Sequence, residues 1–223
     1  MNRAAFEALN HRHRVESARY FSQRPLMRKR GLPAGFGLCA ALVDLWWEGI
    51  RTGRDPFDPA GLPTSELVVR QARHAYPAEP FDPERASDAD RALLTLKYGA
   101  PAPRPQSLAY DLEALHGAVL AESRDWIGSE PGSVPDASDR KGLRLLLLRY
   151  HRGGHRMAFV RSRDGRYRFF DPNAGEVAIA ARGEFAAWFA DFWEKAGYAR
   201  RAPRVTLYRF TTLSPVESAA RES

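Results

Sequence analysis

The chain has 223 residues, of which 44% are hydrophobic and 27% charged, the ordinary usage of a globular protein. This composition excludes a wholly disordered chain, and no apolar run approaches the roughly 20 residues that a membrane-spanning helix needs. The net charge of +7 is compatible with an acidic protein or an anionic membrane surface as partner and does not choose between them, while no motif predicts specific nucleic-acid binding.

The first half of the chain predicts helices that are separated by links containing proline and glycine. In Leu38–Ile50 the apolar residues recur at helical spacing, which predicts a helix. The preceding stretch, Gln23–Gly37, holds two prolines and three glycines and predicts a loop. The other predicted helices are a basic one over Ala4–Phe21, then Thr64–Ala75, Ser87–Tyr98 and Ser107–Ser123.

The second half of the chain predicts strands. They are expected over Leu143–Tyr150, Met157–Arg163, Tyr167–Phe170, Glu176–Ala180 and Val205–Phe210. Asp164-Gly165 predicts a hairpin turn between the second and third of these strands, and Glu184–Ala196 predicts a helix before the last. Helices followed by antiparallel strands indicate an α+β fold. The aromatic residues expected in its core are Trp46, Trp47, Trp188, Phe189 and Trp193.

The single cysteine, Cys39, is a candidate nucleophile. It follows two glycines at the point where the predicted loop becomes the Leu38–Ile50 helix. The free N–H groups and the dipole of a helix N-terminus stabilise negative charge, so a thiol placed there is biased toward the thiolate. A buried, inert cysteine on an apolar helix is the alternative interpretation. One cysteine also excludes an internal disulfide and cysteine-rich metal sites.

Two further residues place acid–base groups on one predicted hairpin. His155 begins a strand directly after a pair of glycines, and Asp171 follows the return strand. Because the turn lies near Asp164, the hairpin brings residues 155 and about 171 opposite each other, where a carboxylate can orient the imidazole. Taken singly, His155 is typical of a loop histidine and Asp171 of an Asx-type turn. Their joint placement with one cysteine favours a Cys-His-Asp site.

These residues lie in segments that resemble the YopT/AvrPphB-type cysteine proteases, a papain-like family of bacterial effectors. The matching segments are Gly37–Trp46, Gly154–Ala158 and Phe169–Glu176. The resemblance implies that Cys39 is the nucleophile, His155 the general base and acid, and Asp171 the carboxylate that orients the imidazole. It implies a thiol protease mechanism that needs no cofactor and no metal.

The resemblance also implies the architecture. We expect one papain-like α+β catalytic domain over residues 31–211, with a helical half that carries the cysteine and an antiparallel sheet half that carries the histidine and the aspartate. An N-terminal basic helix and loop over residues 1–30 would precede it, and a flexible tail over residues 212–223 would follow. The protein is expected to be a monomer.

The chain departs from the family pattern in two places. Papain-like sites usually carry Gln or Asn a few residues before the cysteine to bind the oxyanion, and residues 31–38 contain neither. The N–H of Cys39 remains as a donor, and Gln23, sixteen residues upstream, is the side-chain candidate if the loop folds back, with Asn10 as a more distant alternative. Arg156 follows His155, where the family often has alanine.

Two clusters of basic residues have other interpretations. His11 and His13 have a spacing that hints at a metal site, but no acidic or cysteine partner is near them in the sequence, which favours a solvated basic face. Arg28–Arg30 could contact phosphates, although such a run is more often a solvated loop. We expect no metal at either place.

The resemblance implies an effector that cleaves a protein of a host or target cell and is delivered there by a specialised secretion system. Met1–Phe6 lacks the apolar stretch of a Sec signal peptide, so we expect none. Two alternatives remain open. A glutamine deamidase or transglutaminase would use the same three residues on a side-chain amide. A catalytically inactive, basic interaction module would use none of them.

Overall fold

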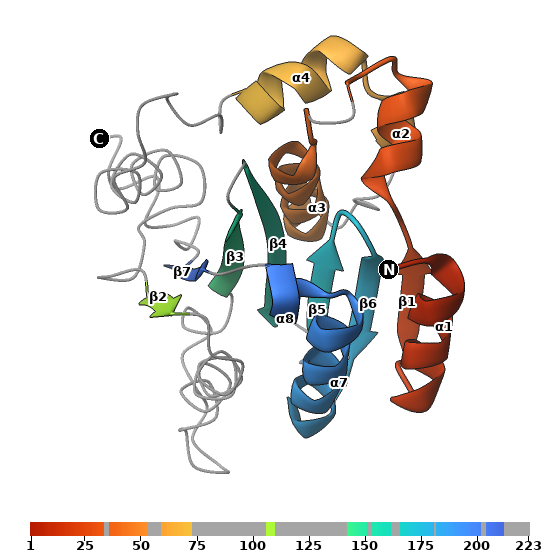
Figure 1. Ribbon diagram of the computed structural model, residues 1–223, viewed down its shortest axis with the longest axis vertical. Coiled ribbons are helices and arrows are strands. Elements are labelled where there is room, and N and C mark those ends of the chain that lie inside the picture. Colours follow the sequence, from red (N-terminus) through yellow and green to blue (C-terminus); the bar gives the residue numbers. More distant parts are fainter. Residues whose placement is uncertain are drawn as a thin grey trace.

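A seven-stranded antiparallel sheet with helices on both faces forms the body of the computed structural model (Figure 1). The structure describes residues 1–33, 36–52, 59–72, 106–109, 142–150, 153–161, 166–180, 182–201 and 204–211. The helices are α1 (Arg3–Arg12), α2 (Gln23–Lys29), α3 (Cys39–Thr52), α4 (Thr64–Ala72), α7 (Arg182–Lys195) and α8 (Tyr198–Arg201), with a 3-10 turn at Pro59–Gly61. No helix in these ranges is long and apolar enough to cross a bilayer.

The order of the strands in the sheet is β1-β6-β5-β4-β3-β7-β2. Their bounds are β1 Ser17–Tyr20, β2 Gln106–Ala109, β3 Gly142–Tyr150, β4 Gly153–Arg161, β5 Tyr167–Asp171, β6 Gly175–Ile179 and β7 Arg204–Thr211. The run β3-β4-β5-β6 is a meander of sequence neighbours, whereas β1, β2 and β7 reach their partners from distant parts of the chain. The predicted α+β class is confirmed.

The two faces of the sheet bury two separate apolar clusters, because successive residues of a strand point to opposite faces. Along β4, Met157 and Phe159 join the cluster that contains the aromatic residues of α7, and Ala158 and Val160 join the cluster of α3. In Figure 1, α7 and α8 lie in front of the strands, while α2, α3 and α4 group at the upper end. The core aromatics expected from the sequence are all buried.

The N-terminal segment differs from its prediction. The expected single helix over Ala4–Phe21 ends at Arg12, and Ser17–Tyr20 forms β1 instead. The backbone turns out of the helix at Arg14, which has a positive φ of 49°. Residues 17–20 then pair with β6, which is a tertiary partner that local periodicity does not reveal.

Two other predictions are corrected. The expected loop Gln23–Gly37 contains α2, because a proline at position 25 is tolerated in a first helical turn and Met27 is buried against the α3 cluster. The expected helix Ser107–Ser123 begins instead as β2, which pairs with β7. The rest of that prediction, the expected helix over Ser87–Tyr98 and the tail over 212–223 lie outside the described residues.

Candidate active site

Cys39 is the first residue of α3 and is only 8% exposed. The N–H groups around it are engaged by two glutamines from other elements. Gln23 Oε1 accepts from the Leu38 N–H at 2.7 Å, and Gln71 Oε1 of α4 accepts from the N–H groups of the two residues after Cys39, at 3.0 and 3.2 Å. No acceptor for the N–H of Cys39 itself lies among the described residues. Within the described part of the chain, this N–H is therefore an unengaged donor.

His155 and Asp171 meet at the open end of the β4–β5 hairpin. His155 Nε2 lies 2.7 Å from Asp171 Oδ1, and both side chains are buried. Oδ1 also accepts from the backbone N–H of Asn173 at 2.8 Å, the expected Asx-type turn, and Oδ2 accepts from the Tyr198 hydroxyl at 2.7 Å. Every contact of this carboxylate stabilises its charged form and fixes its direction toward the imidazole.

Tyr198, at the start of α8, also covers the histidine. Its ring stacks on the His155 imidazole with 5.6 Å between the ring centres and 16° between the planes. The tyrosine therefore holds both members of the pair, the imidazole by its ring and Asp171 by its hydroxyl. It also shields their hydrogen bond, since the residue is only 3% exposed.

Cys39 contacts the same histidine. The pKa of the thiol depends on the His155 imidazole, which acts by hydrogen bonding and by charge, and on the backbone N–H and the charge of Arg156. Burial by itself would raise the pKa of Cys39, but these hydrogen bonds and the positive charges of both residues outweigh burial and lower the pKa of the thiol. Burial would likewise lower the pKa of His155, whereas Asp171 and the bond to Cys39 raise it to about 10. The site favours a thiolate beside an imidazolium.

Gln23 reaches the site by strand pairing. Tyr20 of β1 pairs with Gly175 of β6, and beyond the strand end the Gln23 N–H donates to the Pro172 carbonyl at 2.8 Å. Gln23 Nε2 then donates to Asn173 Oδ1 at 2.8 Å. From the sequence, Gln23 is expected to reach the site through a loop that folds back before Cys39. In the structure, the pairing of the edge strand β1 with β6 places Gln23 there instead.

The structure thus brings together all four residues singled out from the sequence: Cys39, His155, Asp171 and Gln23. The distant alternative, Asn10, is not among them, because its Oδ1 accepts from Trp188 Nε1 at 2.9 Å between α1 and α7. Its surface neighbours His11 and His13 also lie on that side, and His13 pairs with Asp191. No group of three or more metal-ligating side chains is present in the described part of the chain.

Three residues of the site escaped the sequence analysis: Gln71, Asn173 and Tyr198. Asn173 lies in the segment Phe169–Glu176 that carried the resemblance, and its Nδ2 lies 3.4 and 3.5 Å from the two ring nitrogens of His155. The other two lie far from the motif residues in sequence, on α4 and α8. Only the packing of these helices against the site could have identified them.

A family model matches the sheet half of the chain. Residues 133–213 match the peptidase C58 family, described as Yersinia/Haemophilus virulence surface antigen. This segment is 81 of the 223 residues; it includes His155 and Asp171 and begins after Cys39. A search of curated proteins by sequence gives no match.

Two solved structures share the fold. The Pseudomonas avirulence protein AvrPphB is 19% identical with a TM-score of 0.51, over 79% of this chain and 92% of that one. PatoxP, the cysteine protease-like domain of the Photorhabdus asymbiotica toxin PaTox, is 11% identical with a TM-score of 0.50. That match covers 93% of this chain and 58% of that structure.

These comparisons confirm the resemblance to the YopT/AvrPphB-type cysteine proteases, in the sequence of the sheet half and in the fold. The AvrPphB match reaches across most of both chains, so the likeness extends beyond the segment that the family model covers.

Proposed function

We propose that the chain is a cysteine endopeptidase, a hydrolase with Cys39 as nucleophile, His155 as general base and acid, and Asp171 as the residue that orients the imidazole. One observation carries this proposal: His155, whose Nε2 is held by the buried Asp171 carboxylate at 2.7 Å, is also the neighbour that lowers the pKa of the single thiol of the chain. The lowered pKa of the thiol and the raised pKa of the imidazole support an ion pair that is ready to react.

In the proposed reaction the thiolate attacks the carbonyl carbon of the substrate, and the new C–S bond pushes the carbonyl electrons onto oxygen. Because His155 Nε2 faces Asp171, Nδ1 is the nitrogen that gives its proton to the leaving amine as the C–N bond breaks. The imidazole then takes a proton from water, whose oxygen attacks the acyl-enzyme. When the C–S bond breaks, the acid leaves and the thiolate–imidazolium pair is restored.

The oxyanion would be bound by two donors, the backbone N–H of Cys39 and the side-chain amide of Gln23. Only an oxygen can accept from the Leu38 N–H, so the orientation of the Gln23 amide is determined by that contact. Its NH₂ group has two hydrogens, of which one bonds Asn173 Oδ1. The second hydrogen is left for the substrate. A donor of this kind contributes about 10²–10³ in turnover.

The proposed setting is that of an effector. Both similar structures come from bacterial virulence factors, an avirulence protein and a toxin, and the matching family is described as a virulence antigen. We therefore place the protein substrate in the cytosol of a host or target cell, reached through a specialised secretion system. A protein with a single free thiol suits such a reducing compartment.

The test is N-terminal labelling of a target-cell lysate treated with the protein and its variants. We expect new N-termini with the wild type and with His11→Ala, an exposed histidine used as the control, and none with Cys39→Ala or His155→Ala, whose folding is checked by circular dichroism. Gln23→Ala should lower turnover about 10²–10³-fold while Cys39 is still alkylated at its normal rate.

Two outcomes would overturn the protease assignment. If intact-mass analysis shows a gain of about one dalton on a target that stays uncut, the same three residues act on a side-chain amide as a deamidase. If the wild type and Cys39→Ala give the same products and both bind acidic proteins, the chain is a catalytically inactive interaction module.

A further inference from the structure

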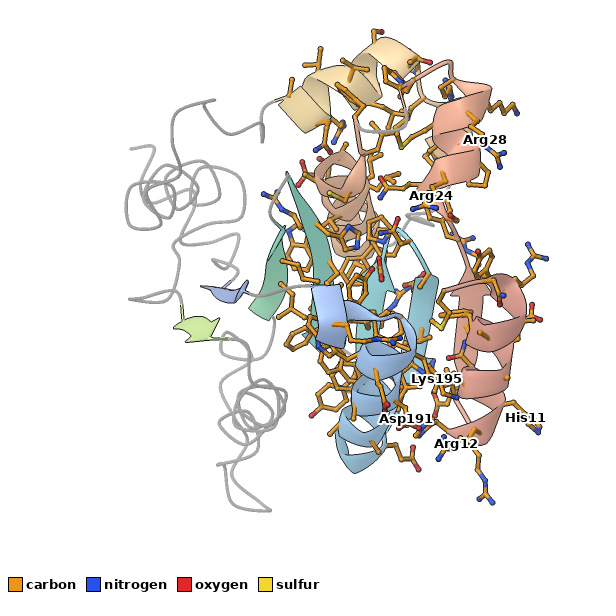
Figure 2. The ribbon with its side chains drawn as sticks, in the orientation of Figure 1. His11, Arg12, Arg24, Arg28, Asp191 and Lys195 are labelled. Carbon is orange, nitrogen blue, oxygen red and sulfur yellow. The ribbon has the colours of Figure 1, made fainter. Side chains whose placement is uncertain are left out.

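The short helix α2 has two different faces. Gln23 and Met27, four residues apart, are buried, one at the candidate active site and the other in the α3 cluster. Arg24 and Arg28, also four residues apart, are exposed, as is Lys29. Figure 2 labels both arginines on α2, at the same end of the molecule as α3. The helix therefore presents a row of cations to solvent while its opposite side contributes to the site.

Residues 17–43, which run from β1 through α2 to the nucleophile, contain five Arg or Lys and no Asp or Glu. Not all five side chains are available to bind a partner. The Arg30 guanidinium is held by Thr64 Oγ1 at 3.2 Å and by the Pro59 carbonyl at 3.1 Å. For Arg24, Arg28 and Lys29, in contrast, no carboxylate partner lies among the described residues. We call these three residues the α2 basic face.

The α2 basic face begins at the site. The backbone N–H of Gln23 donates to the Pro172 carbonyl, in the turn that follows Asp171, and its side chain accepts from Leu38, directly before Cys39. Arg24 is the next residue, and α2 extends from there for about 9 Å at 1.5 Å per residue. Any chain that enters the site along this side has the three cations beside it.

We propose that the α2 basic face binds an acidic segment of the protein substrate next to the scissile bond. The inference rests on the proposed protease function and adds a substrate class to it. On a helix, side chains four residues apart are about 5–6 Å apart, and on an extended chain alternate side chains point the same way about 6.6 Å apart. Arg24 and Arg28 therefore match two carboxylates in the pattern acidic-x-acidic.

The face suits a peptide better than a lipid surface. A helix that lies in a membrane interface carries apolar side chains on its outer side beside the cations. In α2 the apolar Met27 points into the protein, and the exposed positions are Arg24, Pro25, Arg28 and Lys29. Guanidinium groups bind carboxylates through paired N–H donors, and because α2 begins at Gln23, which contacts the site, the partner we propose is the chain that is cut.

A cleavage profile on a library of proteome-derived peptides tests the proposal. The wild type should favour Asp or Glu, in the acidic-x-acidic pattern, within a few residues of the cut. Arg24→Gln/Arg28→Gln should lose this preference and lower kcat/KM for such peptides about 10-fold, more at low salt than at high salt. Peptides with Asn and Gln in the same places should be cut equally by both proteins.

The matched control removes two cations elsewhere on the surface. Arg12 and Lys195 lie at the other end of the molecule in Figure 2, and Arg12→Gln/Lys195→Gln should keep the acidic preference in full. The proposal is overturned if the wild type shows no acidic preference, or if the α2 variant keeps it. If both double variants lose the preference for acidic residues, the net charge of the protein, and not this face, selects the substrate.

Two further measurements separate this proposal from the protease assignment. If the wild type cuts nothing, the Cys39→Ala variant should still bind a fluorescein-labelled peptide of repeated Asp-Gly-Asp units, and Arg24→Gln/Arg28→Gln should weaken the Kd about 10-fold. No difference in Kd overturns the inference. If the α2 variant instead loses only its sedimentation with phosphatidylserine vesicles, the face binds lipid and the substrate class proposed here is wrong.

Discussion

At the scale of single residues, the properties of Cys39 and His155 depend on a small number of neighbours. Each pKa shift is the balance of a burial cost against hydrogen bonds and opposite charge, and in both residues the contacts outweigh burial. Asp171 supplies the charge, and Tyr198 contacts both His155 and Asp171. Replacing one of these neighbours should therefore change the reactivity of the thiol, although Cys39 itself is not altered.

The rate of Cys39 alkylation by iodoacetamide tests this dependence. Because the pKa of Cys39 is lowered, we expect a midpoint below the ordinary value of about 8.5, with the rate falling only as the pH drops through that lowered pKa. Tyr198→Phe keeps the ring and removes the hydroxyl donor of Asp171. The pKa of Asp171 should rise, the imidazolium should lose support and the midpoint should move upward.

The same variant should lose stability, since a buried carboxylate oxygen is left without its donor at a cost of about 1–3 kcal/mol. Urea unfolding measures this loss. Tyr167→Phe, at a buried tyrosine among the α7 aromatics, is the control: its stability can change, but the alkylation midpoint should not. A midpoint that is the same in wild type and Tyr198→Phe would show that the hydroxyl has a structural role alone.

At the scale of elements, α3 depends on α4 for the cap of its N-terminus. The first N–H groups of a helix have no partner within it. Gln71 of α4 satisfies two of them, those of Ala40 and Ala41, with one carbonyl oxygen. The cap therefore joins two helices and acts one residue away from Cys39.

Gln71→Glu should separate stability from reactivity. A carboxylate can accept the same two hydrogen bonds and its charge favours a helix N-terminus, so unfolding should require at least as much urea as in the wild type. The same charge opposes the thiolate of Cys39, so the alkylation midpoint should rise.

Gln71→Ala removes the cap and should cost about 1 kcal/mol of unfolding free energy, with a smaller change in the midpoint. If both variants alter stability and leave the alkylation midpoint unchanged, Gln71 does not act on the reactivity of Cys39.

At the scale of the whole molecule, the edge strand β1 connects the N-terminal segment to the candidate active site. Its pairing with β6 holds Gln23 at the turn that follows Asp171, and α1 docks on α7 through Asn10 and Trp188. The pairing requires a glycine at position 175, because a Cβ there would lie 2.2 Å from the Arg19 carbonyl oxygen and the φ of +125° is unfavourable for other residues.

Gly175→Ala should therefore loosen β1 and lower the free energy of unfolding by at least about 1–3 kcal/mol, the usual cost of strain at such a backbone position. Turnover should fall as well, since Gln23 depends on the pairing. Gly183→Ala is the matched control: a Cβ there meets nothing, the residue is helical, and the change should be neutral or slightly stabilising. Equal unfolding midpoints for the two variants would contradict this account of β1.

Local pattern was sufficient for much of this protein. The structure confirms the helix after Leu38, the run of strands from residue 143 and the aromatic helix near residue 184, because each has a period or a composition that is visible in the local sequence. The position of Cys39 at a helix start and the meeting of His155 with Asp171 followed from the same local rules, since a hairpin needs only its own turn.

Tertiary structure decided what local pattern could not. Residues 17–20 are a strand only because β6 offers an edge, and residues 23–29 are a helix partly because Met27 finds the α3 cluster. Gln71 and Tyr198 enter the site through packing between elements that are distant along the chain. The periodicity of a sequence shows which side of a helix or strand is apolar. It does not show which other helix or strand packs against that side, because this depends on the free energy of the whole fold.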